Sequence, residues 1–464
     1  MKYDFDKPIN RRGTNCVKWD EATPHPSQGE ESLDTICDRN AATETNQAPL
    51  PSGGDGGGLI PLWVADMDFE AAPAIREALR KRVDHGVFGY AIVQPSYYDA
   101  VIRWYERRHQ WHIRREWIQY TTGVVPAISA VIKAITMPGE RVLILTPVYN
   151  CFFSSIRNNG CEVLESKLVP IEAKRPTAQT LTYSVDWDDF ETKCADEKTT
   201  VFLLCNPHNP AGRVWTRDEL QRMADICQRH HVRVVSDEIH CELVMPGHEF
   251  VPFGTIPTPN PSRGEGGLDT LTTDDATSNA NQAPLPSGGA GGGCLGGGCL
   301  GGGCIICCSP SKSFNTAGLQ MANIICADPE TRRRIDRAIN INEICDVNPF
   351  APLAVEAAYN EGAEWIDELN QYLWGNYQAL LAFFAEHLPQ LKVFNLEGTY
   401  LVWVDITPTG LSADQIEEKL LSEAQVWVNS GTMYGAEGYI RINIATQRAR
   451  LMEGLRRMAR VLAP

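Results

Sequence analysis

Four short apolar segments constrain the fold of this chain more than any other feature of its sequence. They span residues 141–145, 201–204, 232–235 and 305–308, and they are rich in β-branched residues, as buried strands are. Helical patterns such as residues 217–229 separate some of them. Because strands that alternate with helices form parallel sheets covered on both faces, the sequence predicts an α/β fold with a mainly parallel sheet.

Three of these segments lead directly into polar loops. Asn209, Asp237 and Lys312 follow the second, third and fourth segments, respectively, and ligands bind at the carboxyl ends of strands in open α/β sheets. A lysine there can form a Schiff base with a carbonyl cofactor, provided that an acid holds the cofactor's ring nitrogen. Each residue also has an ordinary interpretation, as an exposed lysine, a capping aspartate or a turn asparagine. Together they indicate a site for pyridoxal phosphate.

Two further features fit such a site. A helical pattern begins after Gly123, so its first backbone N–H groups could hold a phosphate, and the hydroxyls of Ser309 and Ser311 lie beside the lysine in the sequence. Arg441 lies on the opposite face of an alternating strand from its isoleucine neighbours. A guanidinium there could bind the carboxylate of an amino-acid substrate, although a surface ion pair is the ordinary alternative.

The C-terminal part of the sequence predicts a second, smaller α+β layer. Helical patterns cover residues 332–342 and 351–386, and strand patterns lie around residues 400–404 and 439–444. The N-terminal segment around residues 62–69 is the natural companion of this layer.

These patterns divide the 464 residues into two domains. A large domain that binds the cofactor spans residues 76–335, and a small domain combines residues 1–75 with residues 336–464. Two segments, at about 23–58 and 258–303, contain nearly the same text, and both copies of it end NQAPLPSGGxGGG. Since they hold few large apolar residues, we expect them to be flexible insertions looped out of the fold.

The second insertion ends in a repeat of cysteine and glycine. Residues 294–304 carry a cysteine at every fifth position, which is not the spacing of the common zinc motifs, and no histidine pair accompanies it. We therefore expect no metal site and interpret the repeat as part of the insertion.

Charge and composition exclude several classes of function. The formal net charge of -16 and the isoelectric point near 5.1 argue against nucleic acid or an anionic membrane surface as the main partner. No apolar run approaches the roughly 18 residues of a membrane span, and the first residues lack the apolar segment of a signal peptide. A cytoplasmic location follows as an expectation, in which most of the 15 cysteines are reduced and buried.

The motifs NPHNPAG, SDEIH, SPSKSF and YIRINIA, in this order, resemble those of the aminotransferase class I/II superfamily of fold-type I pyridoxal-phosphate enzymes. The stretches FDKPINRRGTNCVKWD, LWVADMDF, FGY and TPVYNCFF look like the branch of PatB/MalY-like cystathionine β-lyases and related C–S lyases. The resemblance implies a large domain with a seven-stranded, mostly parallel sheet and a small α+β domain built from both termini. It also implies a homodimer with a shared active site.

The resemblance assigns a role to each candidate residue. It implies that Lys312 carries the cofactor and performs catalysis, that Asp237 pairs with the pyridine nitrogen and that Asn209 holds the ring hydroxyl. Arg441 is expected to bind the substrate carboxylate. The other implied cofactor contacts are Tyr149 against the ring, Ser309 and the backbone of Val124 and Val125 at the phosphate, Tyr90 from the partner subunit, and His240.

Two positions depart from the wider superfamily, and the reaction stays open. His240 replaces a tyrosine that many relatives carry, and Gln320 replaces an arginine that grips phosphate in aminotransferases; both suit the lyase branch. The leading interpretation is a lyase that eliminates a thiol from sulfur amino acids. The alternatives are an aminotransferase, which shares every step up to the substrate carbanion, and a regulatory or binding protein that keeps the fold.

Overall fold

The computed structural model describes residues 1–20, 58–173, 180–257, 304–341 and 346–463. The two segments predicted to be flexible insertions, 23–58 and 258–303, lie outside the described residues apart from Gly58. The same holds for the cysteine and glycine repeat, of which only its last cysteine, Cys304, is described. Among the described residues, no helix combines the length and the apolar character needed to cross a membrane.

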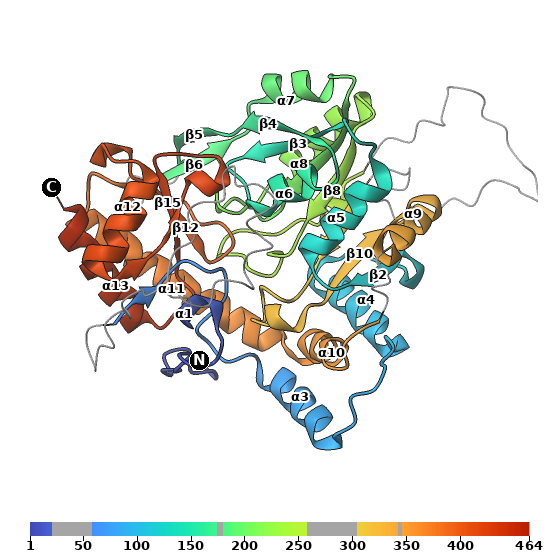
Figure 1. Ribbon diagram of the computed structural model, residues 1–464, viewed down its shortest axis with the longest axis horizontal. Helices are drawn as coiled ribbons and strands as arrows, with labels where there is room; N and C mark the ends of the chain where they lie inside the picture. Colours follow the sequence, from blue (N-terminus) through green and yellow to red (C-terminus); the bar gives the residue numbers. More distant parts are fainter. Residues whose placement is uncertain (21–57, 174–179, 258–303, 342–345, 464) are drawn as a thin grey trace, which may run out of the picture.

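A seven-stranded sheet forms the centre of the larger part of the molecule (Figure 1). All neighbouring strands run parallel except β10, which is antiparallel to both of its neighbours. The seven-stranded, mostly parallel sheet is therefore confirmed. In spatial order, its strands are β2 (Ile118–Thr121), β10 (Ala322–Cys326), β9 (Cys304–Cys308), β8 (Arg233–Asp237), β7 (Thr199–Cys205), β3 (Arg141–Thr146) and β4 (Glu162–Lys167).

Both faces of this sheet are buried, which explains its nearly continuous apolar strands. In β3, Val142 and Ile144 join one hydrophobic cluster, whereas Leu143 and Leu145 join the other, because successive side chains point to opposite faces. The first face is covered by α5 (Val124–Ile135), α6 (Cys151–Arg157) and α9 (Pro329–Asn340). The second is covered by α4 (Pro95–His109), α7 (Trp187–Cys194), α8 (Arg217–Arg229) and α10 (Ala351–Glu361).

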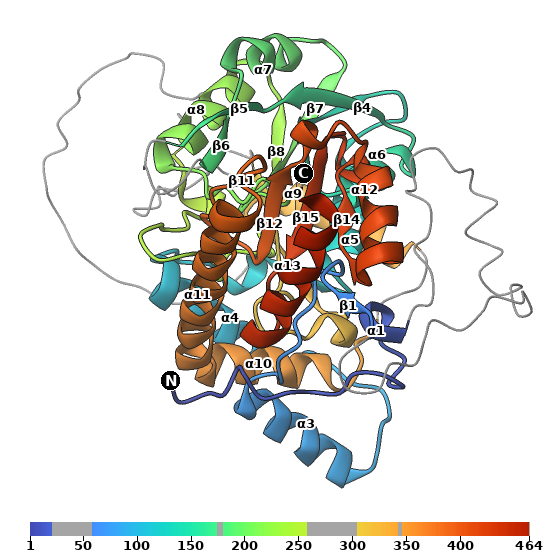
Figure 2. The same cartoon turned by 90° about the vertical axis from the view of Figure 1, so that its left-hand side faces the viewer.

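The second layer is a six-stranded sheet packed against long helices (Figure 2). Its strands, in spatial order, are β14 (Asn429–Ser430), β15 (Tyr439–Asn443), β12 (Leu401–Asp405), β11 (Lys392–Phe394), β6 (Thr180–Ser184) and β5 (Val169–Glu172). The helices α11 (Ala363–His387), α12 (Ala413–Lys419) and α13 (Arg448–Leu462) complete it. β5 and β6 reach this sheet from within residues 76–335, and the domain limits given above stay a prediction.

The N-terminal segment joins the C-terminal layer. β1 (Ile60–Pro61) pairs in parallel with β13 (Val426–Trp427), and the indole rings of Trp63 and Trp427 stack 3.9 Å apart. The short helix α1 (Val17–Asp20) lies beside β1 (Figure 2). This pairing brings the residues after β1 over the edge of the large sheet.

The prediction of one helix over residues 351–386 is wrong. The chain forms α10 and α11, which meet at Gly362. A Cβ atom at Gly362 would lie 2.4 Å from the ring of Phe314, so a side chain there would displace that ring. Phe314 is fully buried and stacks on Trp365 at the start of α11. The break between the two helices thus accommodates the loop that carries Lys312.

Candidate active site

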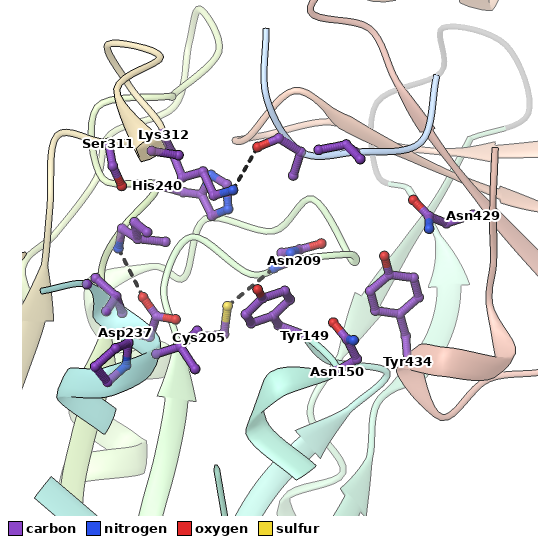
Figure 3. Close-up of a pocket in the computed structure, with 18 of the residues that line it drawn as sticks. Tyr149, Asn150, Cys205, Asn209, Asp237, His240, Ser311, Lys312, Asn429 and Tyr434 are labelled. Atoms are coloured by element: carbon purple, nitrogen blue, oxygen red, sulfur yellow. Dashed lines mark hydrogen bonds between the residues drawn. The ribbon is translucent and has the colours of Figure 1, made fainter. Parts of the chain in front are cut away.

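A cavity of about 500 Å³ lies at the carboxyl ends of the central strands, between the two sheets. Its walls come from the loops after β7, β8 and β9, the start of α5, the segment after β1, and β14 and β15 (Figure 3). Eight of the residues proposed from the sequence line it: Val124, Val125, Tyr149, Asn209, Asp237, His240, Lys312 and Arg441.

Asp237 is the last residue of β8 and is almost completely buried. Its Oδ1 accepts a hydrogen bond from the backbone N–H of Ile239 at 3.1 Å (Figure 3). Burial raises the pKa of Asp237 to about 7, although the Ile239 N–H and the charge of Lys312 oppose this effect. A buried carboxylate of this kind is stabilised when a ligand brings a cationic N–H group to it.

Lys312 lies in the loop after β9 and points toward the segment that follows β1. Its Nζ donates to the carbonyl oxygen of Ala65 at 2.7 Å (Figure 3). Burial, and after it the charge of Arg441, lowers the pKa of Lys312 to about 8, against the opposing influence of Asp66 and other nearby groups. A lysine with a lowered pKa exists partly as the free amine near neutral pH, as a nucleophile or a base must.

Asn209 connects the large sheet to the substrate side of the cavity. Its backbone N–H donates to Cys205 Sγ at 3.4 Å, and its Oδ1 accepts from Arg441 Nη1 at 3.3 Å. The neighbouring His208 is buried, and its Nε2 lies 2.8 Å from the carbonyl oxygen of Pro147. This contact fixes the Asn209 loop to the loop that carries Tyr149.

The start of α5 offers backbone donors on another wall. Val124 and Val125 occupy its first turn, where N–H groups are free of helical partners and the helix dipole favours an anion. Ser311 also lines the cavity, whereas Ser309 is buried beneath the loop. The Ser309 hydroxyl donates to the carbonyl oxygen of Met321 at 2.6 Å and accepts from the Ser311 N–H at 3.1 Å. Ser309 therefore shapes the loop, and Ser311 is the serine on the cavity wall.

The three remaining aromatic candidates have different surroundings. Burial raises the pKa of Tyr149 well above its ordinary value, so its hydroxyl stays neutral. Burial, followed by the charges of Lys312 and Arg441, lowers the pKa of His240 to about 3, and its Nδ1 has no hydrogen-bond partner among the described residues. Tyr90 lies outside the cavity and is 96% exposed.

Arg441 is a buried cation surrounded by neutral acceptors. Its Nη2 donates to the carbonyl oxygen of Trp63 at 2.7 Å and to Asn429 Oδ1 at 2.8 Å, and its guanidinium lies over the ring of Tyr434. Nε has no hydrogen-bond partner, and no carboxylate pairs with this cation, among the described residues. A buried, uncompensated guanidinium is suited to a carboxylate ligand.

The sequence did not reveal Asn429 and Tyr434. Asn429 faces Arg441 across the pairing of β14 with β15, and Tyr434 follows β14 in a short turn. No sequence motif surrounds either residue. Asn429 could have been found only from the register between β14 and β15, and Tyr434 only from the turn that follows β14.

Comparison with known proteins decides the family. The model of the family "Aminotransferase class I and II" matches residues 58–458. The chain belongs to this family. It is 34% identical to the cystathionine beta-lyase PatB of Bacillus subtilis over 462 residues, which cover 99% of this chain and all of PatB. It is 29% identical to the protein MalY of Escherichia coli, over 98% of this chain and 97% of MalY. The resemblance to the PatB/MalY branch is therefore confirmed.

Two solved structures share the fold over 99% or more of the chain. Cystalysin from Treponema denticola, which contains pyridoxal 5'-phosphate, matches with a TM-score of 0.77 and 30% identity, over 100% of this chain and 99% of cystalysin. The pyridoxal-phosphate-bound C–S lyase from Staphylococcus hominis matches with a TM-score of 0.75 and 26% identity, over 99% of both chains.

The residues of the cavity fit the cofactor that these two structures contain. Pyridoxal phosphate presents a ring nitrogen, a hydroxyl, an aldehyde and a phosphate. The cavity offers the buried carboxylate of Asp237, the amine of Lys312 and the first turn of α5. The buried Nδ1 of His240, unpaired within the described part of the chain, is a further polar atom that a ligand could satisfy.

Proposed function

We propose that this chain is a pyridoxal-phosphate-dependent C–S β-lyase that cleaves sulfur amino acids such as cystathionine into a thiol, pyruvate and ammonia. The observation that carries the proposal is the match to PatB over 99% of the chain at 34% identity. The putative aminotransferase YugH of Bacillus subtilis is less similar, at 25% identity over 87% of this chain, whereas a solved putative aminotransferase from Clostridium difficile is 31% identical over 99% of it. The arrangement of the cavity supports a pyridoxal-phosphate enzyme that acts on amino acids, and it fits a lyase and an aminotransferase alike.

In this proposal each part of the cavity holds one part of the cofactor. Bound pyridoxal phosphate supplies an aldehyde for the substrate amine and a ring that accepts electrons from the substrate's Cα. Asp237 holds the ring nitrogen in its protonated form, and Asn209 holds the ring hydroxyl. Tyr149 lies against the ring. Ser311 and the first turn of α5 bind the phosphate, with the buried Ser309 supporting the loop.

Arg441 and Lys312 act on the substrate. Arg441 binds the α-carboxylate, because its guanidinium is buried and its present partners are neutral. This contact turns the hydrogen on Cα toward Lys312. The amine of Lys312, whose pKa is lowered to about 8 by burial, removes that proton. The electron pair left on Cα would form a double bond to Cβ as the bond between Cβ and sulfur breaks, and the thiolate would leave with the electrons of that bond and take up a proton. Water would then hydrolyse the released enamine to pyruvate and ammonia.

An aminotransferase is the second candidate, because it needs the same residues for the same proton removal. The two reactions differ in whether the thiolate leaves before a proton returns to the cofactor. A regulatory or binding protein on this fold is the third candidate. The presence of Lys312, Asp237 and Arg441 in one cavity counts against binding as the sole role.

A homodimer is part of the proposal. Val83, Val87, Phe88, Tyr90 and Ile92 are each more than half exposed, and large apolar side chains that are exposed close together in the sequence are consistent with a protein interface. Within α3 (Pro73–His85), only Ile75 is buried. In the proposed dimer Tyr90 reaches the phosphate in the partner's cavity, which accounts for its position outside the cavity of its own chain.

The experiment uses two incubations of the purified enzyme. The first contains cystathionine and is assayed for homocysteine and pyruvate. The second contains an aromatic amino acid and a keto acid, and is assayed for the exchanged products. We expect fast release of pyruvate in the first and slow exchange in the second. Rapid exchange without thiol or pyruvate from cystathionine would favour the aminotransferase.

A further inference from the structure

The six residues Trp63 to Asp68, here called the strap, hold both cations of the cavity through their backbone. The carbonyl oxygen of Ala65 accepts hydrogen bonds from Lys312 Nζ at 2.7 Å and from the hydroxyl of Tyr400 at 2.9 Å. The carbonyl oxygen of Trp63 accepts from Arg441 Nη2 at 2.7 Å. The position of the strap therefore contributes to where Lys312 and Arg441 lie, together with Asn209 and Asn429 at Arg441.

The other side of the strap is bound by cations from the N-terminal segment. Arg11 donates to Asp66 Oδ1 at 3.0 Å, to Asp68 Oδ1 at 2.9 Å and to the carbonyl oxygen of Met67 at 3.0 Å. Lys18 Nζ lies 3.5 Å from Asp66 Oδ1 and 3.3 Å from Asp68 Oδ2. The strap is thus held between two N-terminal cations on one side and two cavity cations on the other.

Lys18 makes the more unusual of these contacts. Its side chain and that of Asp68 are both completely inaccessible to solvent, and a buried lysine is rare unless it is paired. Its Nζ also donates to the carbonyl oxygen of Asp66 at 3.3 Å, and its own carbonyl oxygen accepts from Trp63 Nε1 at 3.2 Å. Lys18 therefore contacts the strap at its beginning and near its end.

We propose that Lys18 is a positioning residue, which acts on Arg441 and Lys312 through the strap and so sets how tightly the enzyme binds the carboxylate of its substrate. The inference rests on the proposed function only in that the substrate is an amino acid. It holds equally for a lyase and for an aminotransferase, because both reactions use Arg441 and Lys312 in the same way.

Removal of Lys18 leaves the buried carboxylate with other partners. Asp68 also accepts from Trp19 Nε1 at 2.9 Å and faces Arg450 at 3.5 Å, in addition to Arg11. Burial raises the pKa of Asp68, but the charge of Lys18 and the hydrogen bonds to this carboxylate outweigh burial, so the pKa stays below its ordinary value. A Lys18→Met variant should therefore fold with a looser strap.

The test compares Lys18→Met with Lys7→Met in the full-length, cofactor-loaded enzyme. Lys7 comes from the same segment, but its Nζ pairs with Glu70 outside the strap, and both side chains are substantially exposed. We expect both variants to keep the cofactor content and the circular dichroism of the parent. In Lys18→Met alone, hydrogen exchange should rise in a peptide that covers the strap, and KM should rise ~10-fold, the effect of losing about 1.4 kcal/mol of substrate binding.

Two results would overturn the inference. One is an unchanged KM with a lower kcat, because a merely structural defect reduces the fraction of active enzyme and leaves KM alone. The other is unchanged hydrogen exchange in the strap. If Lys18→Met does not fold, Asp66→Asn serves in its place, since it keeps the side-chain size and removes the charge that Arg11 and Lys18 share. The same rise in KM and in exchange is then expected, and its absence contradicts the proposal.

Discussion

The two halves of the cavity are built in different ways. In the cofactor half, Asp237 ends β8 and Lys312 follows β9, and these two strands are neighbours in one sheet. In the substrate half, Arg441 donates to the carbonyl oxygen of Trp63, a residue 378 positions away in the sequence. The cofactor half contains a buried acid with a raised pKa, and the substrate half contains a buried cation with neutral partners. One half is assembled by strand order and the other by contacts between the two ends of the chain.

Lys312→Ala should reduce turnover more than any other change, because Lys312 acts on both the cofactor and the substrate. We expect turnover to fall by at least ~10⁴-fold, since both the nucleophile and the base are lost. The fold should persist, because the loop is held by the buried ring of Phe314. Turnover and circular dichroism are the measurements. Lys193→Ala is the control, as Lys193 pairs with Asp189 away from the cavity, and a near-normal rate for Lys312→Ala would contradict the assignment.

Asp237→Asn should affect the cofactor half alone. A neutral amide cannot keep the ring nitrogen protonated, so we expect the cofactor to stay bound and the rate to fall by ~10³-fold, or about 4 kcal/mol of activation free energy. Cofactor absorbance and kcat are the measurements. If the rate stayed within twofold of that of the parent, Asp237 would not be the residue that keeps the ring nitrogen protonated.

The same carboxylate should make the stability of the cofactor-free protein depend on pH. Between the ordinary pKa of 3.8 and the folded value of about 7, the folded protein binds more protons at Asp237 than the unfolded chain does. The free energy of unfolding should therefore fall as pH rises through this range, by up to ~4 kcal/mol.

The measurement is urea denaturation from pH 4 to 7, for the parent and for Asp237→Asn. Buried His208 and His240, whose pKa values are lowered to about 4 and about 3, give a slope of the opposite sign in both proteins. The difference between the two curves isolates Asp237. Parallel curves would show that Asp237 titrates in the folded protein as it does in the unfolded chain.

Arg441→Lys should affect the substrate half alone. Lysine keeps the charge but loses the planar pair of donors, so kcat/KM should fall by ~10- to 100-fold for all amino-acid substrates alike. The cofactor content should not change. Arg448→Lys is the control, because Arg448 bonds to Asn376 outside the cavity. If kcat/KM fell equally in Arg441→Lys and Arg448→Lys, Arg441 would not be the residue that binds the substrate carboxylate.

Deletion of residues 23–57 should have the smallest effect. These residues lie outside the described part of the chain and hold few large apolar side chains, so their removal should cost little buried apolar surface. The chain on either side is held independently: the carboxylate of Asp20 accepts from the backbone of Gly13, Thr14 and Cys16, and Arg457 binds the carbonyl oxygen of Gly58. Activity within about twofold of the parent is expected, and loss of activity in a folded, cofactor-loaded deletion would assign the segment a part in the site.

The contrast between the two halves also explains what the sequence could predict. Asn209, Asp237 and Lys312 were found because each follows an apolar strand, and strand order brings them together. Arg441 was found from its place in an alternating strand. Asn429 and Tyr434 were not found, because their position depends on how β14 pairs with β15. The break at Gly362 was also missed, since one of the two groups that crowd this position, the ring of Phe314, packs from a distant loop.

Ser309 illustrates the same limit on a smaller scale. Two serines flank the same proline, and the family resemblance assigned the phosphate contact to Ser309. The structure turns Ser309 toward Met321 and leaves Ser311 on the wall. Local motifs therefore identify the loop, and the packing around it selects the side chain.

The central claim is that the substrate loses a thiolate after Lys312 removes its Cα proton. The most direct measurement follows cystathionine in the presence of an excess of a second keto acid, with homocysteine, pyruvate and any newly formed amino acid quantified together. We predict equal amounts of homocysteine and pyruvate, and no amino acid derived from the added keto acid. Formation of that amino acid without release of homocysteine would contradict the lyase assignment.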